Sequence, residues 1–149
     1  MANQTIASEA AVVVEGRGGA FAQRLIAGAH ELTADEPIAA GGTDSGPTPY
    51  QLLLAALGSC TSMTIGMYAR RKQWLVERIE VRLNQSHVHA ADCSACESQS
   101  AQMYRIDREI VIEGALSEEQ RQRLLEIADR CPVHRTLTQK IEIVTRLAP

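Results

Sequence analysis

The sequence predicts an α+β domain made mainly of antiparallel strands, and three observations support this class. Short alternating or β-branched segments occur in groups, two longer helical segments separate these groups, and each helical segment begins with a capping signal. The expected order is β-β-β-α-β-β-α-β, in which neighbouring strands can pair as hairpins. The 149 residues suffice for one domain, 1–149, with a hydrophobic core, and no internal repeat or linker interrupts them.

The N-terminal third is predicted to form a three-stranded meander and a loop. Residues 11–14 are a run of alanine and valine, and 21–26 and 30–33 are two further extended segments separated near Gly28. Glycine and proline pairs mark residues 34–47 as a loop.

The next segment predicts a long, buried helix. Thr48 can cap the helix, Pro49 fits its first turn, and Gln51 completes a capping box. Apolar residues occupy nearly every face as far as Tyr68, which is typical of a helix buried on all sides. Three cations follow at 70–72, where the C-terminal end of the helix dipole favours positive charge.

Two alternating segments then predict a pair of half-buried strands. In 77–89 apolar residues share one face and polar residues the other. Residues 103–113 alternate in the same way, except that Arg108 interrupts the apolar face.

A second helix and a last strand are expected at the C-terminal end. Ser117 and Gln120 form another capping box, an apolar stripe follows, and Pro132 is predicted to end this helix. Residues 141–144 predict the final strand.

Composition narrows the possible functions. A net charge of −3 and only 3% aromatic residues argue against a nucleic-acid partner. We expect no membrane-spanning segment and a cytoplasmic location, because we judge no apolar run long enough for a bilayer and find no charged-then-apolar signal pattern at the N-terminus. Cytosolic cysteines are normally reduced, so four of them indicate catalysis, metal binding or packing before structural disulfides.

Cys60 allows two interpretations. It lies on an apolar helical stripe, where a cysteine can act simply as a small hydrophobic residue. A reactive Cys60 would need a positive neighbour, because the thiolate is the nucleophile and apolar surroundings oppose its formation. Arg17, Arg24 and Arg108 are the candidates, and periodicity does not choose among them.

Cys131 is expected at a helix C-terminus, which disfavours an anion and keeps the thiol protonated. This suits a resolving cysteine, which attacks a sulfenic acid formed on another cysteine. The alternative is a packing role beneath the turn at Pro132.

Two motifs carry a resemblance to a known family. Residues 46–61, GPTPYQLLLAALGSCT, resemble the first cysteine motif of the OsmC/Ohr family of thiol-dependent, peroxide-detoxifying proteins. Residues 131–134, CPVH, resemble the second cysteine motif of an OsmC-like branch. The resemblance covers nearly the whole chain and implies an intertwined homodimer with two central helices and an active site at the subunit interface.

The resemblance also implies a mechanism. Cys60 would attack a hydroperoxide and become a sulfenic acid, and Cys131 would then close a disulfide within the subunit. A dithiol reductant, of lipoyl type in the organic hydroperoxide branch, would restore both thiols, and no bound cofactor is expected. Of the two N-terminal arginines, Arg24 is preferred over Arg17 as the residue that activates the thiolate.

The chain departs from the family at the carboxylate that accompanies this arginine. The position of the family glutamate corresponds to Tyr50 in this chain, and many relatives of this branch carry a carboxylate one place later, at the position of Gln51. Neither Tyr50 nor Gln51 is acidic. Gln51 also has its role in the capping box. Glu36 or Asp44 could supply the charge from the preceding loop, or the Tyr50 hydroxyl could replace it.

Small organic hydroperoxides are the expected substrates, because the stripe around Cys60 is apolar. Two alternatives on the same fold are a redox sensor, which oxidises once, and a non-enzymatic protein that binds a metal or a small ligand.

A second cluster contains His87, His89, Cys93 and Cys96. These ligand types suit zinc, but all four come from one strand end and its loop, whereas zinc sites usually join distant segments. A Cys93–Cys96 disulfide and an exposed loop with surface cysteines are the other interpretations.

Overall fold

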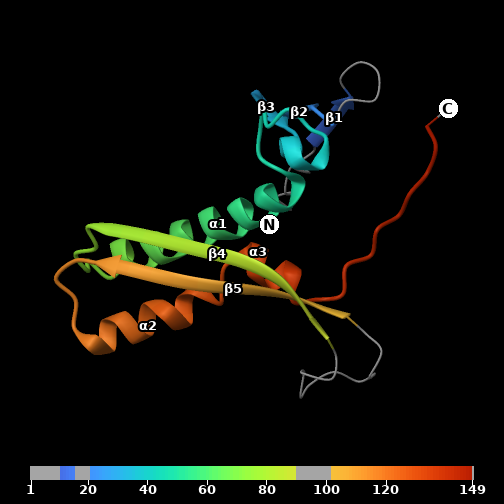
Figure 1. The fold of residues 1–149 in the computed structure, drawn as a ribbon. Coiled ribbons are helices and arrows are strands. Elements are labelled where there is room, and N and C mark those ends of the chain that lie inside the picture. Colours follow the sequence, from blue (N-terminus) through green and yellow to red (C-terminus); the bar gives the residue numbers. More distant parts are fainter. Residues whose placement is uncertain (1–10, 16–20, 90–101, 149) are drawn as a thin grey trace, which may run out of the picture. The chain divides into compact units, whose positions relative to one another are not determined.

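The computed structural model describes residues 11–15, 21–89 and 102–148 (Figure 1). The chain forms two compact units, Met1–Leu53 and Leu54–Pro149, and each is described by itself. The boundary falls within one continuous helix, α1 (Pro49–Arg71). The expectation of a single domain stays a prediction.

The N-terminal unit contains the predicted meander. Strands β1 (Ala11–Glu15), β2 (Gln23–Ala27) and β3 (His30–Ala34) form an antiparallel sheet in the order β1-β2-β3. The tight turn between β2 and β3 contains Gly28 with a φ of 61°, a conformation that glycine adopts at little cost.

A loop connects β3 to α1, as predicted, and contains one short 3-10 helix, η1 (Ile38–Ala40). The predicted capping box opens α1. The Thr48 N–H donates to Gln51 Oε1 at 2.9 Å, and the Gln51 N–H donates to Thr48 Oγ1 at 3.2 Å. These two bonds satisfy backbone donors that the first helical turn leaves free.

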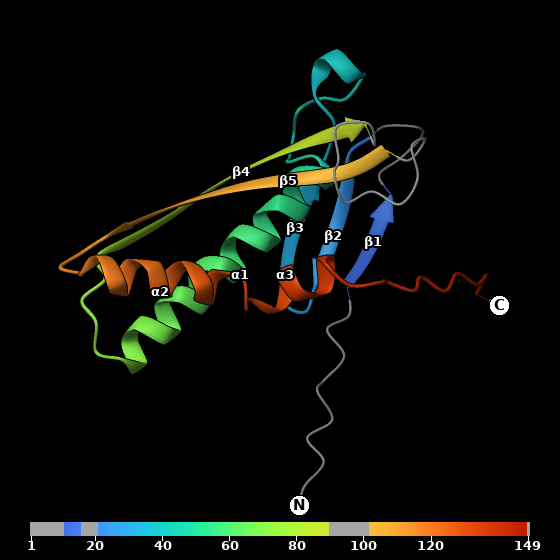
Figure 2. The same cartoon turned by 90° about the horizontal axis from the view of Figure 1, so that it is seen from below.

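The C-terminal unit is built on a long hairpin. Strands β4 (Arg78–His89) and β5 (Gln102–Glu113) pair antiparallel, from Arg78 opposite Glu113 to His89 opposite Gln102. Helix α2 (Glu118–Ala128) follows and begins with the predicted capping box of Ser117 and Gln120. Figure 2 shows α1 and α2 on the same side of this hairpin.

The core of this unit lies where both helices meet the hairpin. Ile65 and Ala69 of α1 and Leu124 and Ala128 of α2 form its buried centre. The apolar residues that pack around this centre come from α1, the hairpin and its connections: Tyr68, Trp74, Val76, Ile79, Ile110, Ile112 and Leu116. The alternating patterns of the two strands thus correctly predicted which face of each strand packs against the core.

Helix α1 corrects the expectation about apolar segments. It is 23 residues long, and its most apolar window has a mean hydropathy of 1.5, so its length and composition alone would allow it to cross a membrane. It is also less buried than predicted. One stripe, which includes Leu57, Thr61 and Ile65, is buried, whereas Met63 and Met67 are exposed in the single chain.

The predicted end of the second helix is wrong. Helix α2 ends at Ala128, and a short new helix, α3 (Pro132–Leu137), begins at Pro132. Proline stops a preceding helix, but its fixed φ and missing N–H also suit the first position of a new one. Cys131 is therefore the N-cap of α3 and does not lie at a helix C-terminus.

The predicted strand at 141–144 is also absent from the structure, in which residues 140–148 are irregular. Ile143 and Val144 are 84% and 80% exposed. An alternating sequence becomes a strand only when another strand satisfies its backbone groups, and the described part of the chain offers this segment no pairing.

Candidate thiol site

The structure brings Cys60 and Cys131 together within the C-terminal unit. Cys60 projects from the middle of α1, and Cys131 precedes α3. Both are free thiols, and the Cys131 side chain lies near enough to the Cys60 thiol to raise its pKa. Cys131 is fully buried, whereas Cys60 is partly exposed. Only Cys60 is therefore directly accessible to a molecule from solution.

Cys131 is surrounded by hydrogen-bond donors. The His134 N–H donates to its sulfur at 3.2 Å, which is the N-cap bond of α3. The Thr61 hydroxyl lies 3.8 Å from the same sulfur. The free N–H groups of a helix N-terminus favour an electron-rich acceptor. The sequence predicted Cys131 at a helix C-terminus, which disfavours negative charge, so the observed environment is the opposite of the predicted one.

The pKa of Cys60 is raised, and the first cause is burial, which disfavours the charged thiolate. The neighbouring Cys131 side chain raises this pKa further. The Val133 N–H and the Thr64 hydroxyl act in the opposite direction. The expectation that apolar surroundings oppose ionisation of Cys60 is thus confirmed.

Arg108, one of the three candidate arginines, joins the thiol cluster through Thr61. Its Nη1 donates to Thr61 Oγ1 at 2.9 Å, and its Nη2 donates to Asp129 Oδ1 at 2.7 Å. Its side chain is only 12% exposed. The residue that interrupts the apolar face of β5 is therefore held in place by contacts with α1 and with the end of α2.

The two other arginines lie elsewhere in the sequence. Arg24, the preferred candidate, is on β2 in the N-terminal unit, where its Nε and Nη2 each donate to a Glu31 carboxylate oxygen at 2.7 Å. Arg17 lies outside the described residues. Activation of Cys60 by Arg24 stays a prediction.

The candidates for the missing carboxylate all belong to the N-terminal unit. The Gln51 amide is engaged in the capping box, as predicted, and Tyr50 is 52% exposed. Glu36 is half-buried in the loop before α1, and Asp44 is exposed there with a φ of 56°. Their participation in the thiol site stays a prediction.

Sequence reasoning missed Asp35, which organises that loop. The carboxylate is 2% exposed and accepts bonds from the backbone and hydroxyl groups of Thr43 and Ser45 and from the Glu36 N–H. The hydroxyl of Thr43, followed by the other donors, holds the pKa of Asp35 well below its usual range. An aspartate ahead of a loop rich in serine, threonine and glycine was the available signal.

The histidine–cysteine cluster cannot be assembled from the described residues. His87 and His89 belong to β4 by their backbone, while their side chains and all of Cys93 and Cys96 lie outside the described part. The zinc and disulfide interpretations stay predictions. Elsewhere in the described part, no group of three or more histidine, cysteine, aspartate or glutamate side chains could hold a metal ion.

A pocket of about 340 Å³ flanks the thiol pair. It is lined by Thr64, Met67, Tyr68, Arg71 and Pro132. Thr64 Oγ1 donates to the Cys60 carbonyl oxygen at 2.7 Å, and Pro132 directly follows Cys131, so the pocket borders residues that adjoin both cysteines.

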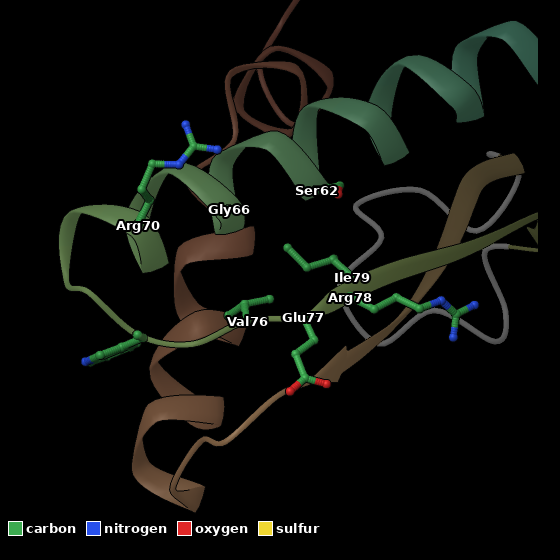
Figure 3. A pocket seen from close by; sticks show the side chains of 8 residues that line it. Ser62, Gly66, Arg70, Val76, Glu77, Arg78 and Ile79 are labelled. Atoms are coloured by element: carbon green, nitrogen blue, oxygen red, sulfur yellow. The ribbon is translucent and has the colours of Figure 1, made fainter.

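A second hollow lies between α1 and the start of β4 (Figure 3). Its lining includes Ser62, Gly66, Trp74 and Ile79 but neither thiol. Neither thiol lines the first pocket either, but that pocket contains Thr64, which bonds the Cys60 backbone, and Pro132, which follows Cys131, so this pocket beside Cys60 is the better candidate for a substrate site.

Comparison with known families decides the classification of the chain. The family model described as OsmC-like protein matches residues 42–146, a range that includes both cysteines. The chain belongs to the OsmC-like protein family. No curated protein sequence matches it.

Solved structures of OsmC-like proteins share the fold. An OsmC-like protein from Mycoplasma pneumoniae is 20% identical, with a TM-score of 0.69 over 87% of this chain and 86% of that one. A protein from Elizabethkingia anophelis described as an organic hydroperoxide resistance protein is 17% identical, with a TM-score of 0.66 over 93% and 94%.

A third relative, from Legionella pneumophila, is described as an organic hydroperoxide resistance protein OsmC and is 18% identical, with a TM-score of 0.63 over 91% of this chain and 92% of that one. The α+β, OsmC-like fold that the motifs implied is thus confirmed. Sequence identities this low show similarity of fold alone.

Proposed function

We propose that this OsmC-like protein is a cysteine-based hydroperoxide reductase. One observation carries the proposal: a partly exposed thiol, Cys60, lies beside a fully buried thiol, Cys131, whose side chain raises the pKa of Cys60. This arrangement suits two separate tasks: a peroxide can reach Cys60 directly, and Cys131 would then close the disulfide with it.

The oxidative steps balance with these two thiols. The Cys60 thiolate attacks the terminal oxygen of ROOH, so that an S–O bond forms, the O–O bond breaks, and the alkoxide leaves as ROH after taking a proton. The Cys131 thiol then attacks the Cys60 sulfenic acid, which forms an S–S bond and releases water. A dithiol reductant, of which a lipoyl group is one form, returns both residues to thiols.

Small organic hydroperoxides are the proposed substrates. The pocket beside Cys60 combines apolar groups, from Met67 and Pro132, with the ring of Tyr68. Two of the structural relatives are described as organic hydroperoxide resistance proteins. Together these observations favour an organic substrate over hydrogen peroxide and a role in oxidative stress, which we place in the cytoplasm.

A homodimer is the proposed working form. Met63 and Met67 are 67% and 69% exposed on α1, and residues 141–148 carry several exposed apolar side chains without a strand partner. Such surfaces mark interfaces in soluble proteins, and burial of the α1 face by a second copy would also cover the pocket beside Cys60.

The test is consumption of cumene hydroperoxide in the presence of dihydrolipoamide. Wild-type protein should turn over, Cys60→Ser should be inactive, and Cys131→Ser should consume about one equivalent per subunit. Equal rates for wild type and Cys60→Ser would overturn the proposal.

A redox sensor is the second candidate, and the raised pKa of Cys60 favours it, because a thiol that is mostly protonated at neutral pH reacts slowly. Complete single-turnover oxidation without steady-state turnover under any dithiol would identify this case.

A further inference from the structure

Arg108 is a buried cation that does not contact either sulfur. Its guanidinium bonds Thr61 on α1 and Asp129 at the end of α2, and its Nη1 also lies 3.5 Å from the Ala128 carbonyl oxygen. A positive charge that is only 12% exposed requires such partners. The three contacts aim Nη1 at Thr61 Oγ1 and leave the guanidinium no freedom to turn away.

The Thr61 hydroxyl lies between Arg108 and Cys131. Its oxygen accepts from Arg108 at 2.9 Å, and its single proton points to the Leu57 carbonyl oxygen at 2.7 Å while the Cys131 sulfur lies 3.8 Å away. A hydroxyl proton can rotate between two acceptors. When negative charge forms on the sulfur, the proton can turn to it, and the bond from Arg108 strengthens the hydroxyl as a donor.

The Cys131 sulfur has one further donor, the His134 N–H at 3.2 Å. The site is therefore prepared for charge on Cys131. That charge develops most when the disulfide is reduced, because the attacked bond expels one of its sulfurs as a thiolate. Cys131 is fully buried, so an external thiol reaches Cys60 and expels Cys131.

We propose that Arg108 is a positioning residue that, through the Thr61 hydroxyl, stabilises the Cys131 thiolate released when a dithiol reduces the Cys60–Cys131 disulfide. This inference rests on the proposed function, since it concerns the reductive half of that cycle. It assigns Arg108 to the departure of Cys131 and not to the activation of Cys60.

The reductive steps balance with the dithiol as the named reductant. One reductant thiolate attacks Cys60 Sγ, a new S–S bond forms, and the electron pair of the broken disulfide goes to Cys131 Sγ. The second reductant thiol then attacks its own partner sulfur and releases Cys60. The reductant leaves as a cyclic disulfide, and its two protons restore the Cys60 and Cys131 thiols.

The test measures the rate at which dithiothreitol reduces a disulfide that diamide has formed beforehand, so no peroxide is needed. Arg108→Met should slow this reduction about tenfold, because a poorer leaving thiolate slows exchange. Thr61→Val, which keeps the side-chain shape but loses the hydroxyl, should also slow the reduction of the disulfide. The double variant should be no slower than the slower single variant, because both act through one hydroxyl.

Two comparisons separate this role from general damage to the fold. Arg108→Lys keeps the charge and should recover part of the rate, and Arg105→Met, on the exposed side of the same strand, should match wild type. Single-turnover oxidation of Cys60 by cumene hydroperoxide should change less than about twofold in Arg108→Met, since Cys60 does not depend on this donor chain.

Three results would overturn the inference. Unchanged reduction in both Arg108→Met and Thr61→Val would remove Arg108 from the reductive step while leaving the proposed function intact. Equal slowing of oxidation and reduction would indicate only structural damage. Failure of the wild-type protein to form the Cys60–Cys131 disulfide would overturn the inference and the proposed function together.

Discussion

Thr61 Oγ1 lies 3.8 Å from the Sγ of Cys131, and both side chains are fully buried although 70 residues separate them in the sequence. Thr61 directly follows Cys60 on α1, so the same turn of helix brings one thiol into contact with the other and a hydroxyl alongside it. The proposed redox pair is thus a product of packing between α1 and the start of α3.

The first prediction concerns the resolving step. Cys131→Ser should leave Cys60 as a sulfenic acid after one peroxide equivalent, because no second thiol can close the disulfide. Labelling with dimedone followed by mass spectrometry should show the adduct on Cys60 in this variant and little of it in wild type. Equal labelling of both proteins would argue against Cys131 as the resolving residue.

The second prediction concerns pH. Burial raises the pKa of Cys60, so the thiolate is the minor form at neutral pH and its fraction grows about tenfold for each pH unit below that pKa. Single-turnover oxidation by cumene hydroperoxide should therefore still accelerate between pH 8 and pH 9, as stopped-flow measurement can show. A rate that is already constant above pH 7 would mean that another residue activates Cys60.

The third prediction concerns Asp35. Because its pKa is lowered in the folded chain, its charged form contributes stability that is fully present above the unfolded value of about 3.9 and is lost as pH falls. Asp35→Asn should therefore increase hydrogen exchange in residues 36–46 at pH 7.

The matched control for Asp35 is Asp44→Asn in the same loop. Asp44 is exposed, and asparagine tolerates its positive φ, so this variant should exchange like wild type. If both variants or neither of them loosened the loop, the role assigned to the Asp35 carboxylate would be wrong.

The fourth prediction concerns the core beneath the thiol pair. Leu124 is fully buried between α2 and α1, and Leu124→Ala should lower the free energy of unfolding by about 2–5 kcal/mol through lost packing and a cavity. Leu125→Ala, next to it but 42% exposed, should cost clearly less. Urea denaturation of both variants measures the difference, and equal losses would contradict the assigned packing.

Much of the fold follows from local sequence. The capping boxes at Thr48 and Ser117 form because the partner residue lies three positions away, so local geometry alone brings the groups together. The hairpin of β4 and β5 follows equally from alternation that matches the period of a strand. The family motifs, which are also local patterns, identified Cys60 and Cys131.

Other features depend on contacts between distant segments. Pro132 both ends one helix and begins another, and only the tertiary structure shows that this change of direction makes Cys131 an N-cap. Residues 141–144 alternate like a strand but form none, because backbone pairing requires a partner that a sequence pattern does not supply.

The sequence by itself thus predicted strands β1 to β5, helices α1 and α2, the family and the two candidate thiols, because each of these is encoded in neighbouring residues. Only the tertiary structure placed Arg108 beside the pair, through its hydrogen bond to Thr61. Arg108, Thr61 and Cys131 come from three different elements, and their hydrogen bonds exist only after α1, β5 and the end of α2 have packed together.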